Sequence, residues 1–209
     1  MVALPDDALD ELWKLYDVSG VRPEWVIPML YLESGFDPSK PNAAGAPHYG
    51  IAQDYGPYLQ RHGIDPATYV TLSAAEQLRT IVAPRIAELA RSYGPLRSAT
   101  RVYQANYVPG TLKTTPGLSS VVAWRGTPAY RDNAGLDVTR DGAITVSDLA
   151  WWMDNRARQP EARAAILRAY ELRPNETPAN VVYGTDFVNP LTATLAFAAA
   201  VAAVAHFAR

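Results

Sequence analysis

Hydrophobic residues recur at helical spacing along most of the chain. Near the N-terminus, Leu9, Leu12, Trp13 and Tyr16 repeat at intervals of three and four residues, which predicts an amphipathic helix. The same spacing predicts further helices over residues 23–34, 74–82, 86–93, 96–103 and 162–172. Strand-like alternation is weak throughout, so the pattern predicts a mostly α fold.

Residues that favour helix ends, kinks and loops occur at several points in this helical pattern. Pro23 suits the first turn of a helix, whereas Pro28 removes a backbone hydrogen bond inside the same helix and predicts a kink. Ser73 and Glu76 have the spacing of a capping box at a helix start. Residues 37–57 are rich in proline, glycine, alanine and asparagine and predict a loop, and a loop of this length in a compact domain is usually functional or mobile. Residues 109–132, with three prolines and three glycines, predict irregular structure.

Composition narrows the classes of protein. The 209 residues are 48% hydrophobic and 19% charged, which supports one globular domain over 1–209. The formal net charge is −2 and no basic run is present, which argues against nucleic acid as a partner. The chain has no cysteine and three histidines, so thiolate metal sites and cysteine nucleophiles are excluded.

Glu33 is the first candidate for chemistry. It follows the apolar stretch Val26–Leu32 at the predicted end of a helix. Apolar surroundings and the negative end of the helix dipole both disfavour the carboxylate, so both raise its pKa toward the roughly 6–7 of a tuned general acid. On this segment alone, a catalytic acid and an ordinary surface glutamate are both open.

Further motifs follow Glu33 in order. They are Glu33-Ser34, Gly50-Ile51-Ala52-Gln53, Ser73-x-x-Glu76-Gln77-Leu78, and Tyr103-Gln104-Ala105-Asn106-Tyr107. Together, over about residues 20–155, they resemble the lytic transglycosylase and goose-type lysozyme superfamily, in a phage-associated variant. The chain departs from the family at Gln104 and Asn106, where asparagine and glycine are usual.

This resemblance implies a lysozyme-like helical fold and cleavage of the β-1,4 bond between N-acetylmuramic acid and N-acetylglucosamine in peptidoglycan. Glu33 would act as general acid and then base, forming a 1,6-anhydro product. The implied substrate-binding residues are Ser34, Gly50, Ile51, Gln53, Tyr103, Gln104, Asn106 and Tyr107. Tyr103 would hydrogen-bond Glu33 or the sugar, and Tyr49, Tyr55 and Tyr58 add aromatic surface for stacking on sugar rings.

A second carboxylate would change the reaction. Glycoside hydrolysis usually needs two carboxylates that flank the bond. The loop offers Asp37, which we expect to cap its own turn before Pro38, and Asp54. If neither faces Glu33, the transglycosylase route follows; if Asp54 reaches the site, a hydrolytic muramidase is the alternative.

Residues 137–148 match the twelve-position loop of an EF-hand. The expected calcium ligands are Asp137, Thr139, Asp141, the backbone of Ala143, Thr145 and Asp148. Gly142 occupies the turn position, and Asp148 replaces the usual glutamate, which predicts a weak structural site for Ca²⁺. We expect an EF-hand-like insertion over 130–155 and C-terminal helices over 160–209 that complete the fold.

The two ends bear on location. The N-terminus lacks the pattern of a signal peptide, which predicts delivery to the cell wall or periplasm by a virion, an injection apparatus or a lysis event. Residues 191–205 are apolar but short for a membrane span, so association through 191–209 is not favoured over a buried helix. Two other functions stay open: a non-catalytic wall-binding or structural part of a phage tail or injection machine, and a calcium-dependent adaptor.

Overall fold

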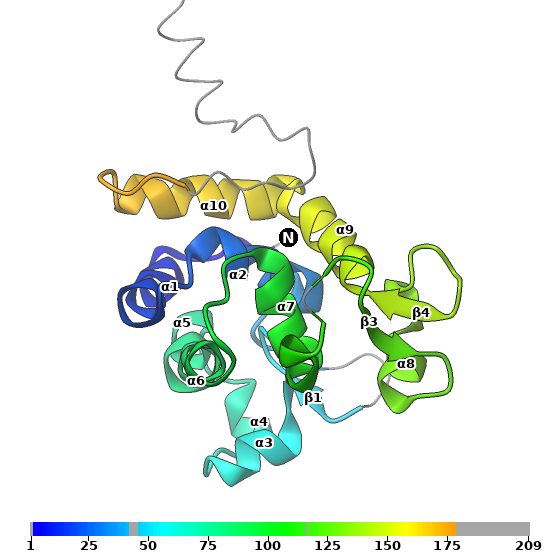
Figure 1. Cartoon of the computed structure of the whole chain (residues 1–209). Coiled ribbons are helices and arrows are strands. Elements are labelled where there is room, and N and C mark those ends of the chain that lie inside the picture. The colour runs from blue at the N-terminus through cyan, green and yellow to red at the C-terminus, as the bar shows by residue number, and fades with distance from the viewer. Residues whose placement is uncertain (1, 42–45, 116, 179–209) are drawn as a thin grey trace, which may run out of the picture. The chain divides into compact units, whose positions relative to one another are not determined.

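The computed structural model describes residues 2–41, 46–115 and 117–178, and within these ranges the protein is mostly α-helical, as the sequence predicts. The helices are α1 Asp6–Ser19, α2 Pro23–Ser34, α3 Gly56–Arg61, α4 Pro66–Tyr69, α5 Ala74–Gln77, α6 Ala83–Tyr93, α7 Ala99–Tyr107, α8 Pro128–Asp132, α9 Val146–Ala157 and α10 Pro160–Leu172. The strands are β1 His48–Tyr49, β2 Asp54–Tyr55, β3 Val121–Trp124 and β4 Ala143–Thr145. Figure 1 shows their arrangement.

Helix α2 forms the centre of the core. It packs against α1, α7, α9 and α10, with α7 in front of it in Figure 1. Its apolar residues surround the helix instead of forming one stripe, which is typical of a buried helix, and Val26, Ile27 and Met29 are fully buried. The helix continues through Pro28 and ends at Gly35, whose left-handed backbone lets its N–H bond to the Tyr31 carbonyl. This places Glu33 on the last turn.

Helices α5 and α6 form one continuous helix with a π-helical turn, Leu78–Val82, between them. The capping box at its start is confirmed: Ser73 Oγ accepts from the Glu76 N–H at 3.2 Å, and the Glu76 carboxylate accepts from the Ser73 N–H at 2.8 Å. A π turn absorbs about one extra residue. Gln77 and Arg85, eight residues apart, therefore lie on one face, as residues about two α-helical turns apart would.

Two small antiparallel sheets were missed by the sequence pattern. Strands β1 and β2 pair within the predicted loop 37–57, and β3 pairs with β4. Strands of two to four residues are too short to show the alternation that identifies a strand. The β1–β2 hairpin carries residues that line the same pocket as Glu33.

By its internal contacts the chain divides into a unit of residues 1–176 and a unit of residues 177–209. Helix α10 belongs to the first unit, where the Trp13 indole N–H donates to the Ala169 carbonyl at 2.9 Å. The apolar stretch 191–205, and with it most of the predicted C-terminal helical region, lies outside the described residues. In the described part, no helix is both long and apolar enough to cross a membrane.

Candidate functional site

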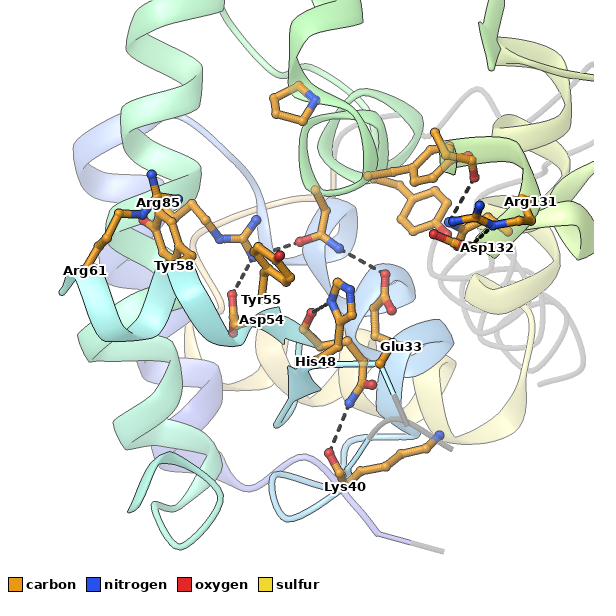
Figure 2. A pocket seen from close by; sticks show the side chains of 18 residues that line it. Glu33, Lys40, His48, Asp54, Tyr55, Tyr58, Arg61, Arg85, Arg131 and Asp132 are labelled. Atoms are coloured by element: carbon orange, nitrogen blue, oxygen red, sulfur yellow. Dashed lines mark hydrogen bonds and ion pairs between the residues drawn. The ribbon is translucent and has the colours of Figure 1, made fainter. Parts of the chain in front are cut away.

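Glu33 faces a pocket of about 1090 Å³. The walls come from the end of α2, the β1–β2 hairpin, α3, α6, α7 and α8. Figure 2 shows Glu33 with Asp54 and Arg85 on one side and Arg131 and Asp132 on the other. The pocket therefore brings together residues from segments that are far apart in the sequence, around one carboxyl group.

The environment of Glu33 disfavours its charge. Burial raises the pKa of this carboxyl from 4.5 to about 7, and the nearby Asp54 carboxylate contributes to the rise. The Arg85 guanidinium and a hydrogen bond from Asn106 act in the opposite direction and keep the rise moderate. At neutral pH, Glu33 therefore exists in both protonation states, which a residue acting first as acid and then as base requires.

A chain of polar contacts leads from Glu33 to the hairpin. Asn106 Nδ2 donates to Glu33 Oε1 at 2.9 Å, and Arg85 donates through one terminal nitrogen to Asn106 Oδ1 at 2.7 Å. Arg85 also forms an ion pair with Asp54 Oδ1 at 2.9 Å, and the Tyr69 hydroxyl donates to Asp54 Oδ2 at 2.6 Å. The side chains of Asp54 and Arg85 are 1% and 14% exposed, so solvent screens this pair only weakly.

Helix α7 sorts the third motif into two faces. Tyr103, Asn106 and Tyr107, spaced by three and four residues, share one face and line the pocket. Gln104 does not line the pocket; it is fully buried, and its amide donates to the hydroxyls of Thr111 and Thr115. The expectation that Gln104 contacts sugar is therefore wrong. One helix step rotates a side chain by about 100°, enough to move it from the pocket into the core.

The two tyrosines of this motif lie close to each other, and Tyr103 lies close to Glu33. Tyr103 is buried, and the Glu33 charge is one cause of its raised pKa, so the two groups are neighbours. In the described part of the chain, however, the hydrogen-bond donor to the Glu33 carboxyl is Asn106 and not Tyr103. Tyr107 stacks near Tyr103, with ring centroids 6.2 Å apart, and its hydroxyl donates to the Ala129 carbonyl.

The pocket lining includes neither Ser34 nor Gly50 and Ile51 of the second motif. Ser34 Oγ donates to the Ile51 carbonyl at 2.8 Å, and the Ile51 N–H donates to Gln77 Oε1 at 2.8 Å. Ser34 and Ile51 are both buried, so neither is placed for substrate contact. Gly50 has φ +76°, and a Cβ there would lie 2.7 Å from Tyr69 Cε1. The nearest atom to such a Cβ would be Gln77 Oε1, so glycine is required here for close packing against Gln77 and Tyr69.

Gln53 is the member of this motif that does line the pocket. Its amide nitrogen donates to the carbonyls of Lys40 and Gly50, at 3.1 and 3.0 Å, and its own carbonyl accepts from His48 Nδ1 at 2.9 Å. Its backbone has φ +50°, a left-handed conformation that these contacts stabilise. The main visible role of Gln53 is therefore to hold the hairpin turn.

The pocket is basic although the whole chain is acidic. It contains Lys40, Arg61, Arg85 and Arg131 against Asp54 and Asp132 when Glu33 is protonated, so four positive charges face two negative ones. Arg85 pairs with Asp54, and Arg131 contacts Asp132 at 2.9 Å. Two cations in excess attract an anionic substrate. Tyr55 and Tyr58 line the same wall as aromatic surface, whereas Tyr49 packs against the core cluster of Leu59, Tyr69 and Ile81.

The two aspartates proposed as second carboxylates separate clearly. Asp37 caps its own turn, as expected, because its Oδ1 accepts from the Ser39 N–H at 2.9 Å and from the Ser39 hydroxyl at 2.7 Å. Asp54 lines the pocket with Glu33, and Asp132 does so too. Glu33 is therefore not a solitary carboxylate, although Asp54 is already engaged by Arg85 and Tyr69.

The predicted calcium loop forms a closed turn. Gly142 has φ +94° at the turn position, and each of the three aspartates accepts hydrogen bonds from groups of the protein. The donors are Tyr130 and Gly142 for Asp137, Ala143 for Asp141, and Val138 and Thr145 for Asp148. Among the described residues, no group of three or more His, Cys, Asp or Glu side chains converges as metal ligands would. The oxygen chemistry suits calcium, but these side chains are not gathered around one point.

Several pocket residues were not found from the sequence. Arg85, Arg61, Lys40, His48, Arg131 and Asp132 belong to no motif, and ordinary charged residues on helices and loops carry no local signal of a shared site. Comparison with protein-family models, with curated proteins and with solved structures finds no match to this chain. The chemistry open to this protein is therefore indicated by the geometry around Glu33.

Proposed function

We propose that this chain is a peptidoglycan-cleaving lytic transglycosylase with a lysozyme-like helical fold. One observation carries the proposal: a glutamate at the end of the buried helix α2 faces a pocket of about 1090 Å³ and has a pKa of about 7. A carboxyl group tuned in this way can donate a proton at neutral pH and later accept one.

In the proposed reaction, protonated Glu33 donates its proton to the oxygen between N-acetylmuramic acid and N-acetylglucosamine, and the bond from that oxygen to muramic C1 breaks. The muramic acetamido group stabilises the positive charge that develops at C1. Glu33, now a carboxylate, accepts the proton of the muramic 6-hydroxyl, whose oxygen bonds to C1. The products are a 1,6-anhydro end and a free N-acetylglucosamine hydroxyl, and no water is consumed.

The chain's own residues support these steps. Asn106 holds Glu33 Oε1, which leaves Oε2 to face the reacting oxygens. Lys40 and Arg61 supply positive charge for the carboxylates of peptidoglycan, and the tyrosines of the pocket supply aromatic surface for sugar rings. The pocket volume of about 1090 Å³ lies at the upper end of ordinary ligand sites, which suits a ligand of several sugar residues.

A hydrolytic muramidase is the second candidate, because Asp54 and Asp132 line the pocket with Glu33. Hydrolysis needs a carboxylate that activates water or attacks C1. Asp54 is less suited to this role, because its two oxygens are engaged by Arg85 and Tyr69. Among the residues that the structure describes, Asp132 is paired only with the exposed Arg131, so its carboxylate is held less firmly than that of Asp54. It lies on the opposite side of Glu33 from Asp54 (Figure 2).

The test uses purified peptidoglycan sacculi with the wild type, the Glu33→Gln variant and, as a matched control, the capping-box variant Glu76→Gln, at a position that does not line the pocket. We expect soluble muropeptides from the wild type and the control, and none from Glu33→Gln. Mass analysis then separates anhydro ends from reducing ends, which are 18 Da heavier by one water. A folded wild type without turnover contradicts the enzyme proposal and favours a non-catalytic wall-binding role.

We further propose that the EF-hand-like loop 137–148 is a weak, structural calcium site, with no metal required for the chemistry. The partner is the glycan strand of peptidoglycan, and nucleic acid is not expected because the chain has a net charge of −2 without a basic run. The proposed substrate lies outside the cytoplasmic membrane, so the protein would act on the cell wall.

A further inference from the structure

We propose that Arg85 is a positioning residue that orients the Asn106 amide and thereby determines which oxygen of Glu33 carries the catalytic proton. This inference rests on the proposed function, whereas the hydrogen bonds that link Arg85, Asn106 and Glu33 are present in the structure itself. Arg85 does not contact Glu33 in a hydrogen bond; it acts through Asn106, which lies between the two side chains.

The first step is the direction of the amide. A guanidinium group has five N–H donors and no acceptor, so it can meet the oxygen of an asparagine amide but not the nitrogen. Arg85 donates to Asn106 Oδ1 at 2.7 Å. Asn106 must therefore turn its Nδ2 toward Glu33, where it donates to Oε1 at 2.9 Å.

The second step is the position of the proton. An N–H donor binds the carbonyl-like oxygen of a protonated carboxyl better than the hydroxyl oxygen, which is the weaker acceptor. Asn106 therefore favours Oε1 as the carbonyl oxygen and places the proton on Oε2. In the described part of the chain, no hydrogen bond to Oε2 is present, so this O–H is available to the pocket.

If the amide were reversed, Asn106 Oδ1 would face Glu33 and accept the acidic proton. The proton would then be held by the protein and withheld from the glycosidic oxygen. Arg85 prevents this reversal, because the reversed amide would set its NH₂ group against the guanidinium donors, and Arg85 would lose one of the two polar partners that it has among the described residues.

Arg85 is itself held firmly enough for this role. The Asp54 carboxylate pairs with it at 2.9 Å, and Tyr69 donates to the other oxygen of Asp54. The π turn before α6 places Arg85 on the face that meets the hairpin, where Gln77 also binds. In Figure 2, Arg85 and Asp54 lie together beside Glu33, so the contact spans α6, β2, α7 and α2.

The experiment follows the carboxyl ¹³C resonance of Glu33 against pH by NMR, in the wild type, Arg85→Met, Arg85→Lys and Arg91→Met. Arg91 is an exposed arginine on the same helix α6 and is the matched control. Without Arg85, we expect the titration midpoint of Glu33 to move to higher pH, because the opposing positive charge is lost. Arg85→Lys restores the charge, so its midpoint returns toward the wild type, whereas Arg91→Met leaves it unchanged.

The activity measurement tests whether Arg85 contributes to the reaction itself. On sacculi, we expect Arg85→Met to lower kcat by about tenfold or more with a small change in KM, as for loss of a group acting in the transition state. Arg85→Lys should recover part of kcat, because an ammonium group is also a donor without an acceptor. A folded Arg85→Met protein whose Glu33 midpoint and kcat both equal those of the wild type overturns the proposal. If the wild type has no turnover, the proposed function fails, and the NMR titration still shows whether Arg85 acts on Glu33: an unchanged Glu33 midpoint in Arg85→Met overturns this inference independently.

Discussion

Because the pKa of Glu33 is raised in the folded state, its carboxylate should lower the free energy of unfolding at high pH. The Glu33→Gln variant should reveal this effect. The unfolded chain releases the Glu33 proton near pH 4.5, whereas the folded protein holds it up to about pH 7. Below pH 4.5 both states are protonated, and Glu33 has no effect on stability through this route. As the pH rises from 4.5 to 7, the folded state loses stability relative to the unfolded state, and above pH 7 the full cost is present.

The magnitude follows from the pKa difference. At about 1.4 kcal/mol for each pH unit, a rise from 4.5 to about 7 lowers the free energy of unfolding by about 3 kcal/mol at pH 8. Glutamine is neutral at every pH and keeps an oxygen for the Asn106 N–H. Glu33→Gln should therefore be more stable than the wild type by about 3 kcal/mol at pH 8 and nearly equal to it at pH 4.

The assay is urea denaturation at pH values from 4 to 9, with the free energy of unfolding extrapolated to water for each protein. Glu76→Gln is the control of opposite sign. Hydrogen bonds from Ser73 lower the pKa of Glu76, so its carboxylate stabilises the fold above pH 4.5 and this stabilisation fades as the pH falls. A constant difference between wild type and Glu33→Gln across this range would refute the reasoning, because burial would then not oppose the charge.

Three further outcomes are expected. Gly50→Ala should destabilise the fold by about 2 kcal/mol or more, because φ is +76° and its Cβ would clash with Tyr69; Gly63→Ala, with φ +74° and open space, should cost about 1 kcal/mol, and equal urea midpoints for the two variants would contradict this. Calcium at 10 mM should stabilise the protein by about 1–3 kcal/mol if its dissociation constant lies in the range of about 10⁻⁴–10⁻³ M, seen as a higher Tm that Asp141→Asn abolishes. The aspartate oxygens already accept protein hydrogen bonds, which weakens binding, and an unchanged Tm would argue against the site. Lys40→Met should raise KM for sacculi at low salt and leave binding of neutral chito-oligosaccharides unchanged; equal effects on both would exclude a charge-based role.

The sequence predicts the core of the site where one segment carries the whole signal. The apolar run before Glu33, the proline at its start and the glycine after it are enough to place the glutamate at the end of a buried helix. The Ser73–Glu76 capping box is equally local and is confirmed. These features depend on neighbours within one or two helical turns, so a single segment suffices to find them.

The prediction fails where a side chain's direction depends on a helix boundary. The hydrophobic pattern ends the helix at 103, whereas Ser98 caps α7, its Oγ accepting from the Arg101 N–H, and the helix runs on to Tyr107. Extending helical periodicity to residue 107 would have grouped Tyr103 with Asn106 and separated Gln104 from both. The prediction for Gln104 is therefore wrong because it ignored which face of the helix each residue of the motif occupies.

Arg85 shows a limit of a different kind. Regular α-helical periodicity from Gln77 would turn Arg85 about 80° away from the hairpin, since eight residues exceed two turns by most of a residue. The π turn at Leu78–Val82 removes that excess, and no residue type in this segment announces it. Arg85, which we propose orients Asn106, thus reaches the site because a π turn changes the register of the helix before it. A motif search centred on Glu33 cannot find such a residue, because its place is set by the backbone geometry of another helix.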